Sequence, residues 1–189
     1  MIEKKIPFVG LHAHSVAGSI FDAIGYPNEH MDFCYENGGE ALALTDHGNM
    51  NGFSHQFLHW QKMKEEGKEF KPIFGVEAYF LPSIDEWHDD YDRIKEDAKL
   101  AKSLAKQGDT SGATVEDEDA SKKAIKSVIN RRRHLVLLAQ NQTGLNNLFK
   151  LISESYREEN FYRYPRVDYK LLAKYSEGVI ASSACLGGP

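Results

Sequence analysis

Short apolar runs alternate with helix-like stretches along this chain of 189 residues, and that alternation limits the fold more than any other feature. Helix-like stretches lie at 27–37, where Pro27 suits the first helical position, at 51–66, and from a capping-type Thr143 onward. The runs between and around them have the length and composition of buried strands, and they occupy residues 8–14, 41–47, 72–80, 134–141 and 178–185. Strands and helices in alternation predict an α/β fold with a largely parallel sheet.

Residues 85–133 interrupt this pattern. They are rich in charge, contain the stretch "KQGDTSGATVEDEDASKK" and show little apolar periodicity. We expect them to form a charged surface insertion that is partly helical and has a flexible middle. The length of the chain fits a single domain, which we place at 1–189.

The composition excludes several classes of protein. A formal net charge of -5 gives no global electrostatic footprint for nucleic acid, although a local basic patch stays possible. The two cysteines, Cys34 and Cys185, are too few for a disulfide framework. The longest apolar runs fall far short of the roughly 20 residues that cross a bilayer. We therefore expect a cytoplasmic protein with no membrane role and no signal peptide.

Metal-ligand residue types gather at the ends of the predicted strands. His12 and His14 end the first strand, and alternate positions on a strand share a face, so their imidazoles can bind one ion. Asp46 and His47 follow the second strand, in "LTDHGNMNG". Because the carboxyl ends of parallel strands collect ligands in α/β folds, we expect these residues to meet. Two such pairs in one chain favour a metal site over isolated surface histidines.

Three further residues fit the same site, each with a simpler alternative. Glu77 follows an apolar run, where a carboxylate is costly to bury unless it is paired or binds a cation, although it could also face solvent. Cys185 could be a ligand or a small buried hydrophobe. Arg133, in "RRRH", belongs to a solvated turn or holds a phosphate. Four other histidines fit a surface or core role better than a ligand role: His30, His55, His59 and His88.

Five stretches of the sequence, taken in order, resemble the motifs of a known family. The stretches "FVGLHAHS", "ALALTDHGNMNG", "KPIFGVEAYFLP", "HLVLLAQNQTGLNNLFKLIS" and "YPRVDYKLLAKYSEGVIASSACLGG" resemble the amino-terminal polymerase and histidinol phosphatase (PHP) domain of the bacterial DNA polymerase III alpha subunit. The resemblance covers nearly the whole chain except 85–133, and "TDHGNM" and "SACLGG" carry most of its specificity. It implies a distorted (β/α)7 barrel, here lacking its carboxyl-terminal part, with up to three divalent metal ions in a cleft at one end.

The resemblance also implies which residues bind each ion. His12 and His14 would hold the first ion, and Glu77 would bridge it to a second. His134 and Cys185 would complete the ligands of the second ion, while Asp22 and His47 would hold a third. Asp46 would orient a ligand histidine. The mixed nitrogen, oxygen and sulfur donors suit zinc best and also admit manganese or iron.

Such a cluster favours phosphoester hydrolysis by a metal-bound water, with no side-chain nucleophile. Within the family this implies a 3′ to 5′ exonuclease that could proofread. The family completes its site with an Asp and a His that we expect beyond Pro189, so the fragment alone is expected to be weakly active or inactive. Polymerisation would need the rest of the subunit as partner: the end of the PHP domain, the palm, thumb and fingers, and through them the DNA primer end.

Two alternatives remain open. The chain could be a stand-alone phosphoesterase of the same superfamily that acts on a small phosphate monoester. It could also be a non-catalytic structural or docking module of the polymerase, in which replacing His12 and His14 lowers stability but no nuclease activity exists.

Overall fold

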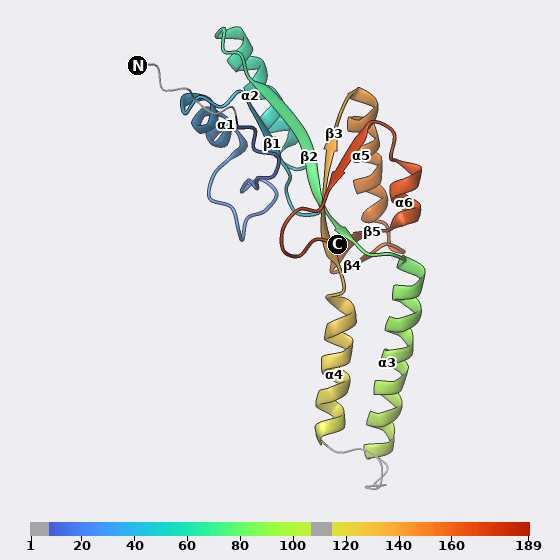
Figure 1. Ribbon diagram of the computed structural model, residues 1–189. Helices are drawn as coiled ribbons and strands as arrows, with labels where there is room; N and C mark the ends of the chain where they lie inside the picture. Colours follow the sequence, from blue (N-terminus) through green and yellow to red (C-terminus); the bar gives the residue numbers. More distant parts are fainter. Residues whose placement is uncertain (1–7, 107–114) are drawn as a thin grey trace. The chain divides into compact units, whose positions relative to one another are not determined.

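The computed structural model describes residues 8–106 and 115–189, and these divide into two compact units. Among the described residues, one unit comprises 8–80 together with 133–189, and the other comprises 81–106 and 115–132. The first unit contains a sheet covered by four helices (Figure 1). Its strands are β1 (Ala41–Leu44), β2 (Lys71–Phe80), β3 (Arg133–Ala139), β4 (Phe161–Tyr162), β5 (Tyr164–Val167) and β6 (Val179–Ser182). Its helices are α1 (Pro27–Glu36), α2 (Phe53–Glu65), α5 (Gln142–Ser155) and α6 (Tyr169–Lys174).

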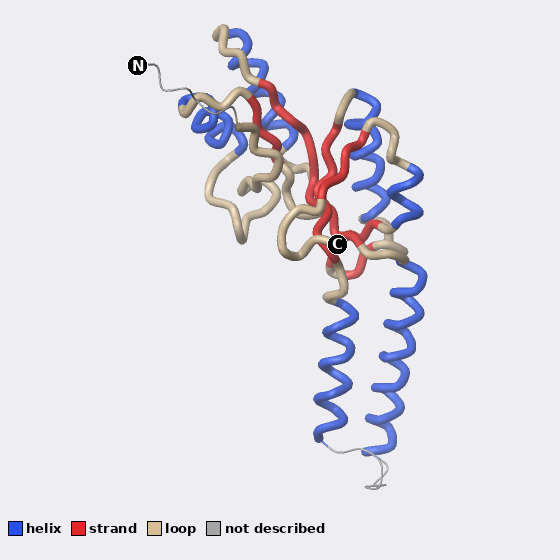
Figure 2. The backbone as a smooth tube through the Cα atoms, viewed as in Figure 1, coloured by secondary structure: helices blue, strands red, loops and turns tan. Residues whose placement is uncertain are grey.

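Strand β2 organises the sheet because it pairs with three other strands. Its first half, from Lys71 to Phe74, runs parallel to β1, and its second half pairs with β3 on one edge and β5 on the other. The strand order is β4-β5-β2-β3-β6, with β1 beside β2 (Figure 2). The chain is therefore mixed α/β. The prediction of a largely parallel sheet is wrong, because β3 returns antiparallel to β2 and β6 runs antiparallel to β3.

Four of the five predicted strands form, and residues 8–14 do not. Within that segment Gly10 alone makes a bridge, to Leu42. Two backbone hydrogen bonds show why: Ala43 N donates to Gly10 O, and Thr45 N donates to Ala13 O. The two acceptors are three positions apart in the sequence, whereas the two donors are only two positions apart. The extra residue interrupts the ladder in the manner of a β-bulge. The segment still lies along β1, so His12 and His14 reach the same region as predicted.

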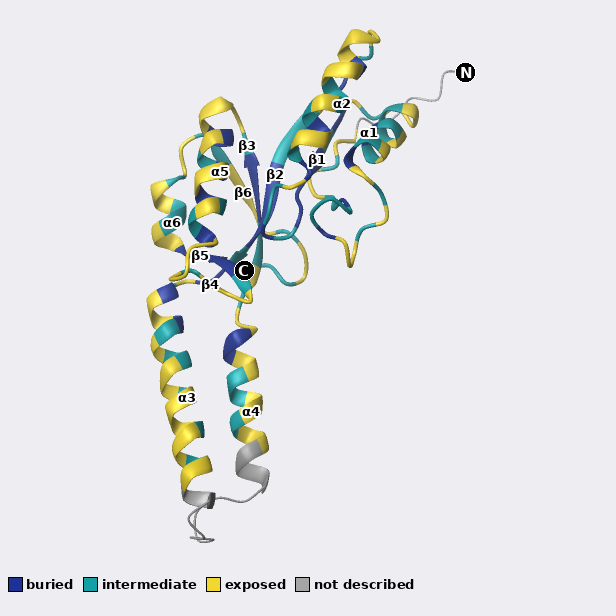
Figure 3. Cartoon of the chain, turned by 180° about the vertical axis from the view of Figure 1, so that it is seen from behind, coloured by how far each residue is buried: buried dark blue, intermediate teal, exposed yellow. Residues whose placement is uncertain are grey.

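The period-2 alternation of β2 gives its two faces different roles. Val76, Ala78 and Phe80 pack with Leu148 and Leu151 of α5 in the main core. Because neighbouring residues on a strand point to opposite faces, Glu77 and Tyr79 lie on the other face. Buried residues line this part of β2 and β3 (Figure 3). A charged side chain is thus fixed in a rigid strand, away from the apolar core.

Helix ends follow from local sequence, with one correction. Pro27 occupies the first turn of α1, as expected. The cap of α5 is Asn141, whose side chain accepts a hydrogen bond from Gly144 N at 2.9 Å, and not Thr143. Asp168 caps α6 in the same way, accepting from Leu171 N. None of the helices in the described part of the chain is long and apolar enough to span a membrane.

The second unit corresponds to the predicted insertion. Helices α3 (Ile84–Lys106) and α4 (Val115–Ile129) form it, so the segment is more helical than expected. Trp87 anchors the pair: its ring stacks on Tyr91, and its Nε1 donates to Val128 O at 2.8 Å. The predicted flexible middle falls on residues 107–114, which lie outside the described residues.

Candidate metal centre

Glu77 is the centre of the candidate site. Its side chain is fully buried on β2, and its two carboxylate oxygens face different groups of residues. His14 Nε2 donates to Oε2 at 2.7 Å, His47 Nδ1 lies 3.0 Å from the same oxygen, and His12 Nε2 lies 3.7 Å from it. His134 Nδ1 lies 2.7 Å from Oε1, with Cys185 Sγ at 3.8 Å. One carboxylate therefore joins two sets of donors.

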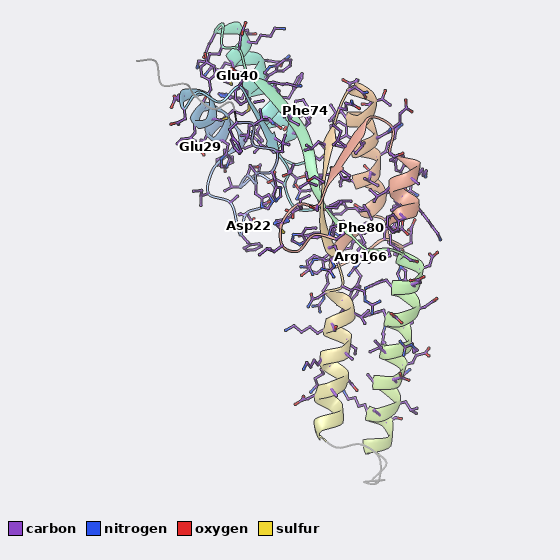
Figure 4. All side chains as sticks on the ribbon, in the orientation of Figure 1. Asp22, Glu29, Glu40, Phe74, Phe80 and Arg166 are labelled. Carbon is purple, nitrogen blue, oxygen red and sulfur yellow. The ribbon has the colours of Figure 1, made fainter. Side chains whose placement is uncertain are left out.

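Asp22 extends the cluster on its exposed side. Its Oδ2 accepts from His47 Nε2 at 2.6 Å and lies 3.4 Å from His14 Nδ1. Figure 4 shows Asp22 on the loop before α1, and its side chain is 47% exposed against 1% for Glu77. The cluster thus runs from a buried carboxylate to an open one.

All seven residues predicted as ligands meet in this cluster. They form overlapping groups of potential donors whose atoms lie within 4.8 Å of one another: His12, His14 and Glu77; His14, Asp22 and His47; and His47, Glu77 and His134. Cys185 joins the last group, with Sγ 3.5 Å from His134 Nδ1. His134 lies at the start of β3, whereas His47 and Cys185 follow the ends of β1 and β6. The antiparallel pairing explains this, because the start of β3 lies against the end of β2.

Burial and nearby charges shift the pKa values of three residues in the cluster, Glu77, His47 and His12. Burial alone raises the pKa of Glu77, but hydrogen bonding to His14 and the nearby His47 and His134 outweigh it and hold that pKa well below its usual value. The close Glu77 carboxylate raises the pKa of His47 above 6.5, and Asp22 adds to this. Burial lowers the pKa of His12, which keeps that imidazole neutral. The two histidines His12 and His47 therefore differ in the direction in which their surroundings shift the pKa.

The distances fit metal ligation. Donor atoms about 2.1 Å from a tetrahedral ion lie about 3.4 Å from one another. Separations of 3.0, 3.4, 3.5 and 3.7 Å occur in the cluster, between His47 and Glu77, His14 and Asp22, Cys185 and His134, and His12 and Glu77. His47 Nδ1 is buried close to Glu77 without a hydrogen bond of good geometry, so this nitrogen is placed to bind an ion once the imidazole has lost its extra proton. The donors present fit divalent cations.

Comparison with known proteins identifies the family. The family model described as the PHP domain matches residues 10–189, which include all seven cluster residues. The chain belongs to the PHP domain family. This PHP chain is 35% identical over 181 residues to the DNA polymerase III subunit alpha of Aquifex aeolicus, and 37% identical over 188 residues to that of Helicobacter pylori. These matches cover 96% and 100% of the chain, but it spans only 12% of the length of either relative.

The PHP chain is homologous to the amino-terminal region of these polymerase subunits. Among solved structures, it is similar to a protein from Bifidobacterium adolescentis assigned as a metal-dependent phosphoesterase. That likeness has a TM-score of 0.42 at 10% identity, and it covers 81% of this chain and 34% of the other.

Asp46 and two serines, Ser15 and Ser19, support the residues of the PHP cluster through hydrogen bonds. Asp46 accepts hydrogen bonds from Ser15 N (2.6 Å), Ser15 Oγ (2.8 Å) and Ser19 Oγ (3.0 Å), and Ser19 Oγ in turn accepts from His47 N. Asp46 therefore braces the loop that carries His14 and Asp22 and reaches His47 through Ser19.

Thr45 and Tyr79 support two of the histidines directly. Thr45 Oγ1 lies 2.8 Å from His12 Nδ1 and donates to Ala13 O at 3.4 Å, so it accepts from His12 and leaves His12 Nε2 facing Glu77. The Tyr79 ring stacks on His47 at 5.9 Å and 4°. The sequence prediction missed both residues, and the only signal was their position next to a predicted ligand or on its strand face. Arg133 is exposed and donates to Gly188 O at 3.5 Å.

Proposed function

We propose that the cluster around Glu77 is a metal-dependent phosphodiesterase site of the 3′ to 5′ exonuclease type, in the PHP domain of a replicative DNA polymerase. One observation carries the proposal: a single buried carboxylate has His12, His14 and His47 at one oxygen and His134 and Cys185 at the other. This arrangement is what a residue that bridges two cations requires.

Each cation has a candidate set of ligands. We assign His12 and His14 to the first, His134 and Cys185 to the second, and Asp22 with His47 to the third, with Glu77 between the first two. The thiol and the imidazoles favour zinc, and the two carboxylates also suit manganese or iron. The fold proposed to hold the cluster is a distorted (β/α)7 barrel.

Divalent cations in such a site polarise a phosphoryl group and activate water for attack, so no side-chain nucleophile is required. The residues of this chain position that chemistry. Glu77, held in β2 and nearly inaccessible, fixes the spacing of the cluster. Asp22 stands at the open side, next to a hollow of about 270 Å³ that His12 and His14 also line, and substrate would enter there.

The similarity to polymerase subunits suggests the biological setting. We infer that this domain works in DNA replication in the cytoplasm, joined to the remainder of the subunit, including the polymerising palm, thumb and fingers. DNA would reach the cluster as a primer end delivered by those domains. The chain alone would not polymerise DNA.

The test measures metal content before activity. We expect the purified chain to bind two or more equivalents of transition metal, and a variant with His12→Ala and His14→Ala to bind fewer. His55→Ala is the matched control, because His55 is an exposed histidine of α2 outside the cluster. Failure to bind added zinc, manganese or iron would refute the site.

Activity then separates hydrolysis from a structural role. The metal-loaded full-length subunit is expected to release 5′-mononucleotides from the 3′ end of single-stranded DNA and to hydrolyse bis(4-nitrophenyl) phosphate, and this chain alone is expected to do so weakly or not at all. Cleavage of phosphate monoesters alone would instead indicate a small-molecule phosphatase. Metal binding with no hydrolysis by this chain or by the full-length subunit would leave only the structural role.

A further inference from the structure

Two hollows meet beside the candidate metal centre. The metal-side hollow, of about 270 Å³, is lined by His12, His14 and Asp22 among others. A second hollow of about 420 Å³, which we call the apolar hollow, is lined by residues that include Phe8, Phe33 and Leu42. Ala13 and His30 line both, so the two spaces share a wall. A ligand bound at the metal centre would have to pass Ala13 and His30 to reach the apolar hollow.

The apolar hollow has aromatic residues that the fold leaves uncovered. Phe8 is 78% exposed, and Phe33, on α1, is 70% exposed. Such rings cost free energy in water, and they offer flat faces to a planar ligand. The volume lies within the range of about 300–1,000 Å³ that small-molecule sites occupy.

His30 forms the shared wall by packing, not by hydrogen bonding. Its ring lies against the Gly25 backbone, so closely that a Cβ added to Gly25 would lie 3.1 Å from Nε2, and that nitrogen is buried without a partner among the described residues. Gly25 is itself fixed by its carbonyl, which accepts from Val16 N at 2.9 Å. The boundary between the two hollows is therefore built from ordered parts of the chain.

We propose that the apolar hollow is a nucleobase subsite that holds the base of the terminal nucleotide while its phosphate lies at the metal centre. This inference rests on the proposed function and specifies its substrate. A nucleotide combines a phosphate with a planar, largely apolar base, and the two neighbouring hollows match these two parts. Base–aromatic stacking on Phe33 and Phe8 supplies the attraction.

The subsite does not discriminate between bases. Asn37, a polar residue on its lining, donates its side-chain amide to Phe33 O at 2.8 Å, which occupies one of its donors. His30 and Cys34 are the other lining residues with polar side-chain atoms, and the rest of the lining consists of carbon-rich side chains and glycines. Purine and pyrimidine nucleotides are therefore expected to bind within a few-fold of each other, as a nuclease that removes any terminal nucleotide requires.

The test compares ligands with and without a base. Thymidine 5′-monophosphate, deoxyribose 5-phosphate and inorganic phosphate are titrated calorimetrically into the manganese-supplemented chain. We expect the nucleotide to bind at least fivefold more tightly than the sugar phosphate. Phe33→Ala should weaken nucleotide binding roughly 5- to 100-fold, the effect of losing one stacking contact, and should leave inorganic phosphate binding and metal content unchanged.

Leu58→Ala is the control, because Leu58 is also an exposed apolar residue on a helix, at 64%, and does not line either hollow. Alanine suits both helices, so neither variant should unfold. Equal binding of nucleotide and sugar phosphate, absence of nucleotide binding, or a Phe33→Ala effect shared by all three ligands would each overturn the subsite. Hydrolysis of bis(4-nitrophenyl) phosphate tests the proposed function separately. Base-dependent binding without hydrolysis by the full-length subunit would overturn the function alone, and hydrolysis without base-dependent binding would overturn the subsite alone.

Discussion

Replacement of Glu77 by glutamine tests the organisation of the whole cluster. The amide is nearly isosteric with the carboxylate but neutral, so its contacts with the histidines weaken while the packing stays. Glu77 has three histidine nitrogens within 3.0 Å, from His14, His47 and His134. A hydrogen bond to a charged group contributes about 1 kcal/mol more than one between neutral groups. The His14 bond alone gives a loss of about 1 kcal/mol, and the loss reaches about 3 kcal/mol if the two other close contacts contribute equally.

The effect is measured by thermal unfolding in the presence of a chelator. For a chain of this size, about 3 kcal/mol corresponds to a fall in Tm of roughly 6–12 °C. Without the chelator, Glu77→Gln should also lower the metal content to one equivalent or less, because the bridging charge is lost. Glu66→Gln is the control: Glu66 pairs with Lys68 at 2.8 Å on the surface, where solvent screens the pair, so its loss should leave Tm nearly unchanged. A Glu77→Gln variant as stable and as rich in metal as the wild type would refute the central role of this residue.

Three further predictions address the surroundings of the cluster. Asp46→Asn should weaken metal binding about 10- to 100-fold, measured by chelator competition, because the brace through Ser15 and Ser19 loosens; unchanged affinity would count against that brace. Zinc affinity should rise as the pH increases from 6.5, because His47 must lose the proton that its raised pKa retains. Over the same pH range the metal-free fold should lose the stability that the ion pair between His47 and Glu77 contributes. A flat pH profile would contradict this. Trp87→Phe should destabilise residues 81–132 by about 1–3 kcal/mol, seen as faster amide exchange there, and leave metal content intact; loss of metal would argue against independent units.

The sequence predicted the candidate site better than the sheet. Histidine, carboxylate and thiol side chains stand out at strand ends, so their convergence follows once the strands are placed. Strand direction does not follow, because antiparallel β3 depends on where the chain returns after residue 132, and hydrophobic periodicity is the same for either direction. The short strands β4 and β5 include Phe161 and Tyr162 but lie in a polar stretch that gives no alternating signal.

The supporting residues were harder to predict for a different reason. Asp46 and Ser15 are 31 positions apart, and Thr45 and His12 are 33 apart. Hydroxyl groups bond to many partners, so their contacts are set by tertiary packing and not by local pattern. The bulge between residues 10 and 13 is likewise a property of two segments in contact, and it decides that this stretch is not a regular strand.

The ladder between β2 and β3 has a consequence for how this domain can change in length. Phe80 and Arg133 are paired across it, so the chain leaves and re-enters the sheet at the same rung, and everything from 81 to 132 is an elaborated hairpin turn. A two-residue Asn-Gly turn could replace that excursion without moving either strand. Evolution has the same freedom, since lengthening a closed loop costs only about 0.6 kcal/mol per doubling. We expect gain or loss of this segment among relatives to leave the Glu77 cluster unaltered.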